Sequence, residues 1–328
     1  MLRQRAPTAG RSVRPVKQRH LGASGLLVSE VGFGTTTLGE AVHGDEAIAL
    51  VRDAMDAGIT YFDTAITYSG GHSEELLGKA IAGHRDEVVI GTKVGLRAPG
   101  TSELTYGLSR RRIMQAIEIS LRRLGTDHVD LYMAHRPDPT TPLDETLEAM
   151  DRLVLDGKVR YAGGSNYAAW QMAVAHGIAE RRGLSPWVCA QNRWNVIDGL
   201  EDPSLVDAAR AFGFGIIPYQ PLASSVLTGK YRSGEEPAPG TRAHDFPRFR
   251  PDVTEPRLAA VERLRPWVAS RGHSLAELGI AWLLAHDVTA TVIVGLRTRA
   301  QILENVRAAE WSLSADERDE ARRVALGN

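Results

Sequence analysis

The chain has 328 residues, of which 43% are hydrophobic and 24% are charged, a composition typical of a globular protein with a substantial core. Its 39 lysines and arginines balance 40 aspartates and glutamates, so the net charge of −1 gives no reason to expect nucleic acid or an anionic membrane as a partner. The single cysteine, Cys189, excludes an intramolecular disulfide and a cysteine-rich metal site.

The N-terminal residues 1–17 are basic and include proline, glycine and serine, but they lack the apolar stretch of a secretory signal. We expect them to form a disordered basic tail rather than a nucleic-acid-binding arm. No apolar run approaches the ~20 residues needed to span a bilayer. We therefore expect a cytoplasmic protein in which residues 18–328 form a single domain.

A small hairpin with a glycine-containing turn is predicted over residues 20–28. After it, short apolar runs alternate with longer amphipathic segments. Each run is almost continuously apolar, as expected of parallel strands covered on both faces. The predicted strands are Val31–Gly34, Ile59–Asp63, Val88–Lys93, Val129–His135, Val159–Ser165, Trp187–Gln191, Gly215–Tyr219 and Thr291–Gly295.

The intervening segments predict helices, and Asp45, Ser73 and Ser109 are interpreted as signals for helix starts. The predicted helices are Asp45–Ala57, Glu74–Ala82, Arg110–Leu124, Leu143–Asp156 and Ser204–Phe212. Eight strand–helix units without a break in composition favour an α/β fold of the (β/α)₈ TIM-barrel type. The rival fold, an open doubly wound sheet, lacks its usual G-x-G-x-x-G motif after the first strand.

Two further segments complete the predicted architecture. The N-terminal hairpin is placed to plug the bottom of the barrel, and Ser314–Leu326 follows Arg299–Ala308 as an extra C-terminal helix that closes over one end. The segment Thr228–Glu255 is long and rich in proline and arginine, and such loops are usually lids or binding loops. A surface excursion without function is the alternative for this loop.

Polar residues follow three consecutive predicted strands, at the end of a barrel where active sites form. They are Asp63, Tyr68, Lys93 and His135. A lysine directed into a barrel needs a carboxylate nearby, and Asp63 ends the neighbouring strand. Each residue alone has a structural interpretation, but the four together indicate a site.

This cluster suits proton transfer to a developing alkoxide. The Lys93 ammonium is expected to lower the pKa of the Tyr68 phenol, and Asp63 to keep Lys93 charged. A neutral His135 would donate a hydrogen bond to a substrate carbonyl oxygen. None of these groups is a strong nucleophile, so a nicotinamide hydride is the natural source of electrons.

From about Arg19 to its end, the chain resembles the aldo-keto reductase family. The matching motifs are Gly58–Ala65 with Tyr68, Thr92–Val94, His135–Pro139 leading to Thr141–Leu143, Gly157–Tyr161 with Ser165 and Asn166, and Pro221–Leu222 with Leu227–Tyr231. The resemblance implies that Asp63, Tyr68, Lys93 and His135 are a catalytic tetrad in the roles just described.

The resemblance also implies NADP(H) as cofactor and a set of residues that bind it. Ser165, Asn166 and Gln191 match positions that bind the nicotinamide carboxamide, and Tyr219 matches the residue that stacks on the nicotinamide ring. The other implied cofactor-binding residues are Gly34, Thr35, Asp63, Gln220, Pro221, Leu222, Ala223, Ser224 and Leu227, and, at the adenosine and 2′-phosphate end, Gly295, Arg297, Thr298, Gln301 and Asn305.

Three positions depart from the family pattern. Leu296 cannot donate a hydrogen bond near the 2′-phosphate, so the preference for NADP over NAD rests largely on Arg297. Trp194 stands where a tyrosine is common, and it either reshapes the pocket or packs in the core. Ser69 replaces the usual glycine after Tyr68.

Three functions are compatible with these residues. The first is an NADPH-dependent carbonyl reductase acting on a small-molecule aldehyde or ketone, with a sugar-derived or nucleotide-linked keto compound among the candidates. The second is a non-catalytic NADP-binding regulatory or sensor subunit on the same barrel, as in the potassium-channel β subunits of the family. The third, a metal-dependent hydrolase, lacks a dense set of ligands, so no metal is expected. The arginines of the long loop suit either an anionic substrate or the cofactor phosphates.

Overall fold

A computed structural model describes residues 16–96 and 106–328 of the chain. The predicted tail lies outside the described residues except for Val16 and Lys17. The fold is built on eight parallel strands, which lie side by side in the order β10-β8-β7-β6-β5-β4-β3-β11. They are β3 (Val31–Gly34), β4 (Tyr61–Asp63), β5 (Val89–Val94), β6 (Val129–Ala134), β7 (Val159–Ser165), β8 (Trp187–Asn195), β10 (Gly215–Tyr219) and β11 (Val292–Gly295).

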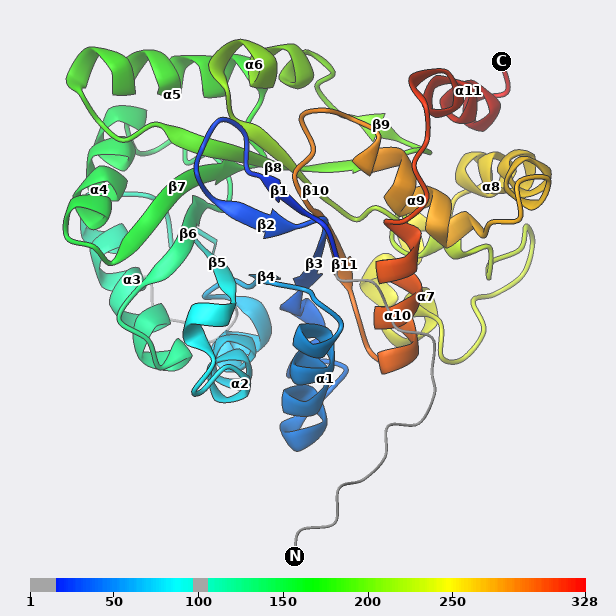
Figure 1. Cartoon of the computed structure of the whole chain (residues 1–328), viewed down its shortest axis with the longest axis horizontal. Helices are drawn as coiled ribbons and strands as arrows, with labels where there is room; N and C mark the ends of the chain where they lie inside the picture. Colours follow the sequence, from blue (N-terminus) through cyan, green and yellow to red (C-terminus); the bar gives the residue numbers. More distant parts are fainter. Residues whose placement is uncertain (1–15, 97–105) are drawn as a thin grey trace, which may run out of the picture.

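The two ends of this sheet meet, so the strands curl into a barrel (Figure 1). Ile216 of β10 forms a parallel bridge with Thr289, which lies just before β11. The Ile216 amide donates to the Val288 carbonyl at 2.7 Å. The eight-stranded α/β architecture predicted from the sequence is confirmed, with strand boundaries that shift by a few residues and β8 longer than expected.

Helices surround the strands (Figure 1). They are α1 (Gly44–Asp56), α2 (His72–Ala80), α3 (Arg110–Leu124), α4 (Leu143–Leu155), α5 (Ala169–Arg182), α6 (Ser204–Phe212), α8 (Glu255–Ala269), α9 (Leu275–Leu284), α10 (Arg299–Ala308) and α11 (Ala315–Leu326). In α3 the buried residues Ile113, Ile117, Leu121 and Leu124 recur every three or four positions, which gives one apolar stripe facing the strands. None of the helices in the described residues is both long and apolar enough to cross a bilayer.

The N-terminal hairpin pairs β1 (Gln18–His20) with β2 (Leu27–Ser29). Its side chains Leu21 and Val28 are fully buried in an apolar cluster with residues from the strands. Gly22 has a positive φ of 59°, and a Cβ there would lie 2.4 Å from the Gly213 carbonyl oxygen. The hairpin therefore packs against the segment that precedes β10, at the end of the barrel opposite the strand C-termini.

Two predicted helix starts are wrong. Helix α1 begins at Gly44, one residue before the predicted start, and α2 begins at His72, two residues before the predicted start, so that Asp45 and Ser73 lie inside the helices. The Ser73 hydroxyl donates to the Thr35 carbonyl at 2.8 Å, because tertiary packing turns this side chain inward. Ser109 does precede α3, although its side chain makes no capping hydrogen bond.

The segment predicted as a long loop contains two short helical pieces, α7 (Arg242–Asp245) and η6 (Pro247–Asp252), before α8 begins at Glu255. We call residues 230–254 the arginine loop. At the C-terminus, α11 follows the capping residue Ser314 and packs beside α8 and α9. The indole nitrogen of Trp282 donates to the Arg318 carbonyl at 2.8 Å across this contact.

Candidate active site

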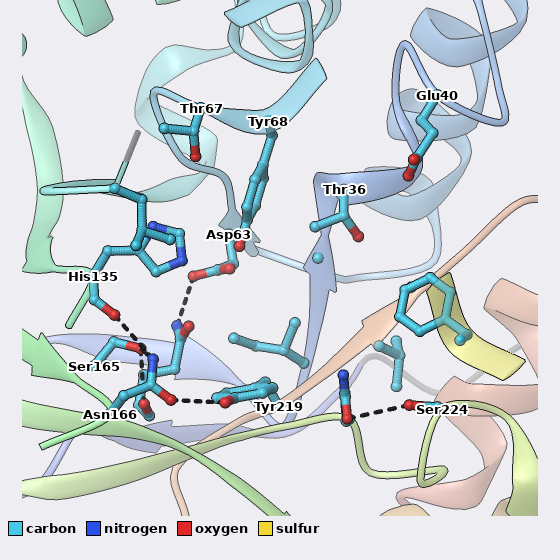
Figure 2. A pocket seen from close by; sticks show the side chains of 18 of the residues that line it. Thr36, Glu40, Asp63, Thr67, Tyr68, His135, Ser165, Asn166, Tyr219 and Ser224 are labelled. Carbon is cyan, nitrogen blue, oxygen red and sulfur yellow. Dashed lines mark hydrogen bonds between the residues drawn. The ribbon is translucent and has the colours of Figure 1, made fainter. Parts of the chain in front are cut away.

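The four residues singled out as a cluster lie at one end of the barrel. Asp63 ends β4, Tyr68 follows on the next loop, Lys93 lies near the end of β5, and His135 directly follows β6. Strands β4, β5 and β6 are neighbours in the sheet, which explains why residues far apart in the sequence converge. Figure 2 shows Tyr68 reaching toward Asp63, with His135 beside them.

Lys93 is fully buried, and its ammonium group has three partners. Its Nζ donates to Asp63 Oδ1 at 2.6 Å, to the Thr64 carbonyl at 2.8 Å and to Tyr68 Oη at 3.3 Å. These contacts match the three hydrogens of an ammonium group. Burial lowers the pKa of Lys93, but Asp63 and Tyr68 raise it by more, so the group stays protonated. A buried charge of this kind is stable only when it is paired.

The second carboxylate oxygen of Asp63 is also satisfied. It accepts from Gln191 Nε2 at 2.8 Å and from Tyr61 Oη at 3.2 Å. Tyr61 was not predicted as a site residue from the sequence. Alternation along a strand would have identified it, because residues two apart point to the same face.

The pKa of Tyr68 differs from the expectation. Burial raises it, and this outweighs the lowering by the Lys93 ammonium. The expectation of a lowered pKa is therefore wrong. It took into account the Lys93 ammonium beside the phenol, but it left out the desolvation of the phenol. The phenol is protonated at neutral pH, which is the form that can donate a proton.

The imidazole of His135 is partly buried, with its Nδ1 removed from solvent, and its ring centroid lies 5.9 Å from that of Tyr68. Burial, together with the charges of Lys93 and Arg136, lowers its pKa well below the ordinary value. His135 is therefore neutral at physiological pH and has one N–H to donate. Its Nδ1 has no hydrogen-bond partner among the described residues.

Asp63, Tyr68 and His135 lie on the wall of a cavity of about 1030 Å³. The predicted residues on its wall are Gly34, Asp63, Tyr68, His135, Ser165, Asn166, Gln191, Tyr219, Gln220, Pro221, Leu222, Ser224 and Gly295. A second cavity of about 420 Å³ shares Thr36, Glu40 and Arg242 with the first. Its wall includes Arg297, Gln301 and Asn305. Because they share wall residues, the two cavities form one cleft, and its second part has neither Tyr68 nor His135 on its wall.

Some predicted site residues are not on either wall in the described part of the chain. They are Thr35, Lys93, Ala223, Leu227 and Thr298. The Thr35 hydroxyl instead donates to the Asp63 carbonyl at 3.1 Å, and the Thr298 hydroxyl caps α10. Trp194 packs in the core against Trp282 and His286, which favours packing over a role in the pocket.

A hydrogen-bond network joins three of the predicted nicotinamide-binding residues to His135 (Figure 2). Asn166 Nδ2 donates to the His135 carbonyl at 2.9 Å and to Ser165 Oγ at 3.0 Å. Asn166 Oδ1 accepts from Tyr219 Oη at 2.7 Å. Asn166 adopts a positive φ of 62°, and in this conformation its side-chain amide contacts His135, Ser165 and Tyr219. The network fixes this wall of the cavity relative to His135.

The loop after β10 has an unusual backbone. Gln220, Ala223, Ser224 and Ser225 all have positive φ values, between 47° and 75°. Such strain in residues other than glycine clusters at ligand-binding sites. The Ser224 hydroxyl donates to Asp252 of the arginine loop at 2.6 Å, so the two loops are connected directly.

The far end of the cleft is basic. Arg248 pairs with Glu40, and Arg297 pairs with Asp245 at 3.3 Å. Arg242 lies 4.0 Å from the Phe249 ring centroid and has no carboxylate within ion-pair distance among the described residues. Burial and the charges of Arg297 and Arg248 lower the pKa of Arg242.

A guanidinium without a counter-charge in a cleft is suited to an anion such as phosphate. The two connected cavities and this basic end are suited to a ligand that carries phosphate. Lys230 also lines this end. From the sequence, Arg242 could be recognised only as one of the arginines of the long loop, and Lys230 was not predicted as a site residue. Within the described residues, no group of three histidine, cysteine or acidic side chains is placed to hold a metal.

A parallel barrel with a buried lysine–aspartate pair and a phenol at the wall of a large cavity provides proton-transfer groups at its strand ends. The chain belongs to the aldo/keto reductase family, whose profile matches residues 30–325. A "Probable voltage-gated potassium channel subunit beta" of Oryza sativa subsp. japonica is 34% identical over 90% of this chain and 92% of its own length.

Two other relatives are named as enzymes. An "Uncharacterized oxidoreductase YrpG" of Bacillus subtilis is 34% identical over 90% of this chain and 92% of its own length. The versiconal hemiacetal acetate reductase of Aspergillus parasiticus is 33% identical over 90% of this chain and 93% of its own length. The family and these relatives identify the chain as an oxidoreductase.

Proposed function

We propose that residues 18–328 form one catalytic domain that reduces an aldehyde or ketone with NADPH, with Tyr68 as the general acid. The observation that carries the proposal is the chain of contacts that runs from the buried Asp63 and Lys93 to the partly buried Tyr68 at the wall of the large cavity. These groups can deliver a proton, but none of them can deliver electrons, which agrees with the need for a reducing cofactor.

The residues of the cleft are suited to NADPH along its length. Ser165, Asn166, Gln191 and Tyr219 would hold the nicotinamide, and the strained loop Gln220–Ser225 would hold the pyrophosphate. Arg297, Gln301 and Asn305, with Arg242 and Lys230, would hold the adenosine and 2′-phosphate. When bound, the reduced nicotinamide supplies the hydride. NADPH is favoured over NADH because the basic end of the cleft offers two guanidinium groups and an ammonium group.

Tyr68 is proposed to donate its proton to the substrate oxygen as negative charge develops there. The phenol is protonated before reaction, since burial raises its pKa. The Lys93 ammonium stabilises the phenolate that remains, and Asp63 keeps that ammonium charged and in place. General acid catalysis of this type contributes about 10²- to 10⁴-fold to the rate.

His135 is proposed to orient the substrate. Because it is neutral, its single N–H can donate to the carbonyl oxygen without placing a second positive charge near Lys93. A preorganised donor at a developing oxyanion is typically worth about 3 kcal/mol. The link from Asn166 to the His135 carbonyl holds this residue relative to the nicotinamide end of the cavity.

For the substrate, we propose a small aldehyde or ketone, with sugar-derived or nucleotide-linked keto compounds as further candidates. Most arginines of the arginine loop have carboxylate partners within the chain. Arg248 pairs with Glu40, and Arg250 lies 3.7 Å from Glu236. These pairs, and the place of Arg242 in the second cavity, favour the cofactor-phosphate interpretation of the loop over an anionic substrate.

A second candidate is a regulatory or sensor subunit that binds NADP(H) without sustained turnover. It is favoured by the similarity to proteins named as potassium channel β subunits. The intact Asp63–Lys93–Tyr68 contacts support the reductase instead.

One experiment distinguishes the two proposals. Purified protein is mixed with NADPH and a panel of aldehydes, ketones, quinones and nucleotide keto-sugars, and the absorbance of the reduced cofactor is followed. Continued oxidation over many equivalents supports the reductase. A single stoichiometric oxidation that then stops supports the sensor, and it contradicts the reductase proposal.

A further inference from the structure

Arg123 in α3 contacts the loop that carries Tyr68, and it does not line the cavity. Arg123 Nη1 donates to the Ile66 carbonyl at 2.9 Å, and Nη2 approaches the Gly70 carbonyl at 3.4 Å. These two carbonyls lie two residues before and two residues after Tyr68. One guanidinium therefore holds both sides of the loop from which the phenol projects.

A buried carboxylate fixes this guanidinium. Glu74 in α2 is fully buried, and its Oε2 accepts from Arg123 Nη1 at 3.1 Å. Its other oxygen, Oε1, accepts from the hydroxyl of Thr92 at 2.8 Å. Thr92 directly precedes Lys93 in β5. Glu74 thus joins the strand that carries the ammonium to the loop that carries the phenol.

The loop needs such support because its backbone is strained. Ser69 has φ of 49°, a left-handed value that disfavours residues other than glycine, and Gly70 and Gly71 follow with φ of 66° and 101°. A Cβ at Gly71 would lie 2.1 Å from Arg123 Cζ, so the guanidinium packs directly against the glycine backbone. Hydrogen bonds from a charged guanidinium are stronger than those between neutral groups, and they can hold a loop in such a conformation.

We propose that Arg123 and Glu74 are positioning residues that hold the Tyr68 hydroxyl within reach of Lys93 and the substrate. The proposal rests on the proposed function, since the geometry of Tyr68 matters for turnover only if Tyr68 is the acid. The contact that we expect these residues to maintain is the one between Lys93 Nζ and Tyr68 Oη, which are 3.3 Å apart. A displacement of about 1 Å at such a group can lower a rate by about 10²-fold.

The test compares Arg123→Met, which removes the donors, with Arg123→Lys, which keeps a charge and fewer donors. Arg122→Met is the matched control, because Arg122 is exposed on the same helix. For Arg123→Met we expect kcat to fall between about 10- and 100-fold, with the Kd for NADPH changed less than about twofold. Arg123→Lys should recover part of the loss, and Arg122→Met should behave like the parent.

A second measurement does not depend on activity. Amide hydrogen exchange in peptides that cover residues 64–72 should become about tenfold faster in Arg123→Met, which corresponds to ~1.4 kcal/mol of local stability. Exchange in β6 and β7 should not change. Glu74→Gln keeps the shape of the side chain and should show the same pattern with a smaller effect.

Two results would overturn the proposal. One is a folded Arg123→Met protein with parental kcat and parental exchange in residues 64–72. The other is a loss of kcat that is matched by weaker NADPH binding and is not recovered by Arg123→Lys, which indicates a general structural role. If the parent protein shows no turnover, the proposed function fails, whereas the exchange measurement still decides whether Arg123 holds the loop.

Discussion

The two ends of the cleft are built from different kinds of interaction. At the Tyr68 end, Lys93 and Asp63 are almost completely removed from solvent and are held by several short hydrogen bonds. At the arginine-loop end, the side chains of the Glu40–Arg248 pair are 30% and 55% exposed, and those of Arg297–Asp245 are 28% and 31% exposed.

This difference indicates different tasks. A buried and fully hydrogen-bonded pair such as Lys93–Asp63 cannot move without a large loss of free energy. Such a pair is suited to holding the proposed proton donor in a fixed position. Exposed ion pairs contribute little and exchange partners readily, which agrees with a loop that admits and releases the cofactor we propose. The same cleft thus combines a rigid end and an adjustable end.

The largest expected effect is on stability at the buried end. Lys93→Met leaves the Asp63 carboxylate buried without its cation, and we expect the free energy of unfolding to fall by about 3 to 5 kcal/mol. Arg152→Met removes the cation from the exposed pair Arg152–Asp156, and it should change the free energy of unfolding by less than about 0.5 kcal/mol. Urea unfolding monitored by circular dichroism measures both. Equal losses in the two variants would remove the contrast between buried and exposed pairs.

The next effect is on turnover. Tyr68→Phe removes the hydroxyl and keeps the ring, so we expect kcat to fall by at least about 100-fold while NADPH binding is kept. Tyr161→Phe, on β7, is the matched control, because Tyr161 packs with the apolar cluster that contains the hairpin residues. Steady-state kinetics and a fluorescence titration of NADPH provide the two readouts. Near-normal turnover of Tyr68→Phe would remove this residue from its proposed role.

A smaller effect is expected at the basic end. Arg297→Leu and Arg242→Leu should each weaken NADPH binding by about tenfold or more and leave NADH binding nearly unchanged, since charged hydrogen bonds to phosphate contribute about 1.5 to 3 kcal/mol. Arg242→Leu should have the larger effect, because Arg297 is already shared with Asp245. Parallel titrations with the two cofactors measure the change. An equal loss for NADH and NADPH would contradict a contact with the 2′-phosphate.

The smallest effect is expected for the exposed pair Glu40–Arg248 on the wall of the first cavity. Glu40→Gln should change NADPH affinity by less than about 1 kcal/mol, mainly through a faster release of the cofactor. The difference from the parent should shrink as salt rises from low to about 0.5 M, because exposed pairs are screened. Stopped-flow release measured at two salt concentrations gives both values. A large effect that does not depend on salt would mean that this end is as rigid as the other.

Local sequence features predicted most of the framework. The apolar runs predicted all eight strands, and the order of the polar residues that follow them predicted which strand ends carry Asp63, Lys93 and His135. The helix-start signals at Asp45 and Ser73 were wrong for different reasons. Asp45 lies exposed in the first turn of α1, one residue after the helix begins, whereas Ser73 is turned inward toward Thr35 by packing. The arginine loop contains two short helical pieces that lack an apolar period long enough to be recognised.

The sequence by itself determined the eight-stranded α/β architecture and the identity of the groups at its strand ends. The periodicity of strands and helices, and the order of these elements along the chain, can be recognised from short stretches of sequence. Only the tertiary structure decided how those groups behave. The pKa of Tyr68 depends on how deeply its ring is buried, and the positions of Tyr61, Arg123, Glu74 and Arg242 depend on contacts between segments far apart in the chain. Desolvation and long-range hydrogen bonds are properties of the folded chain as a whole, and residue spacing does not report them.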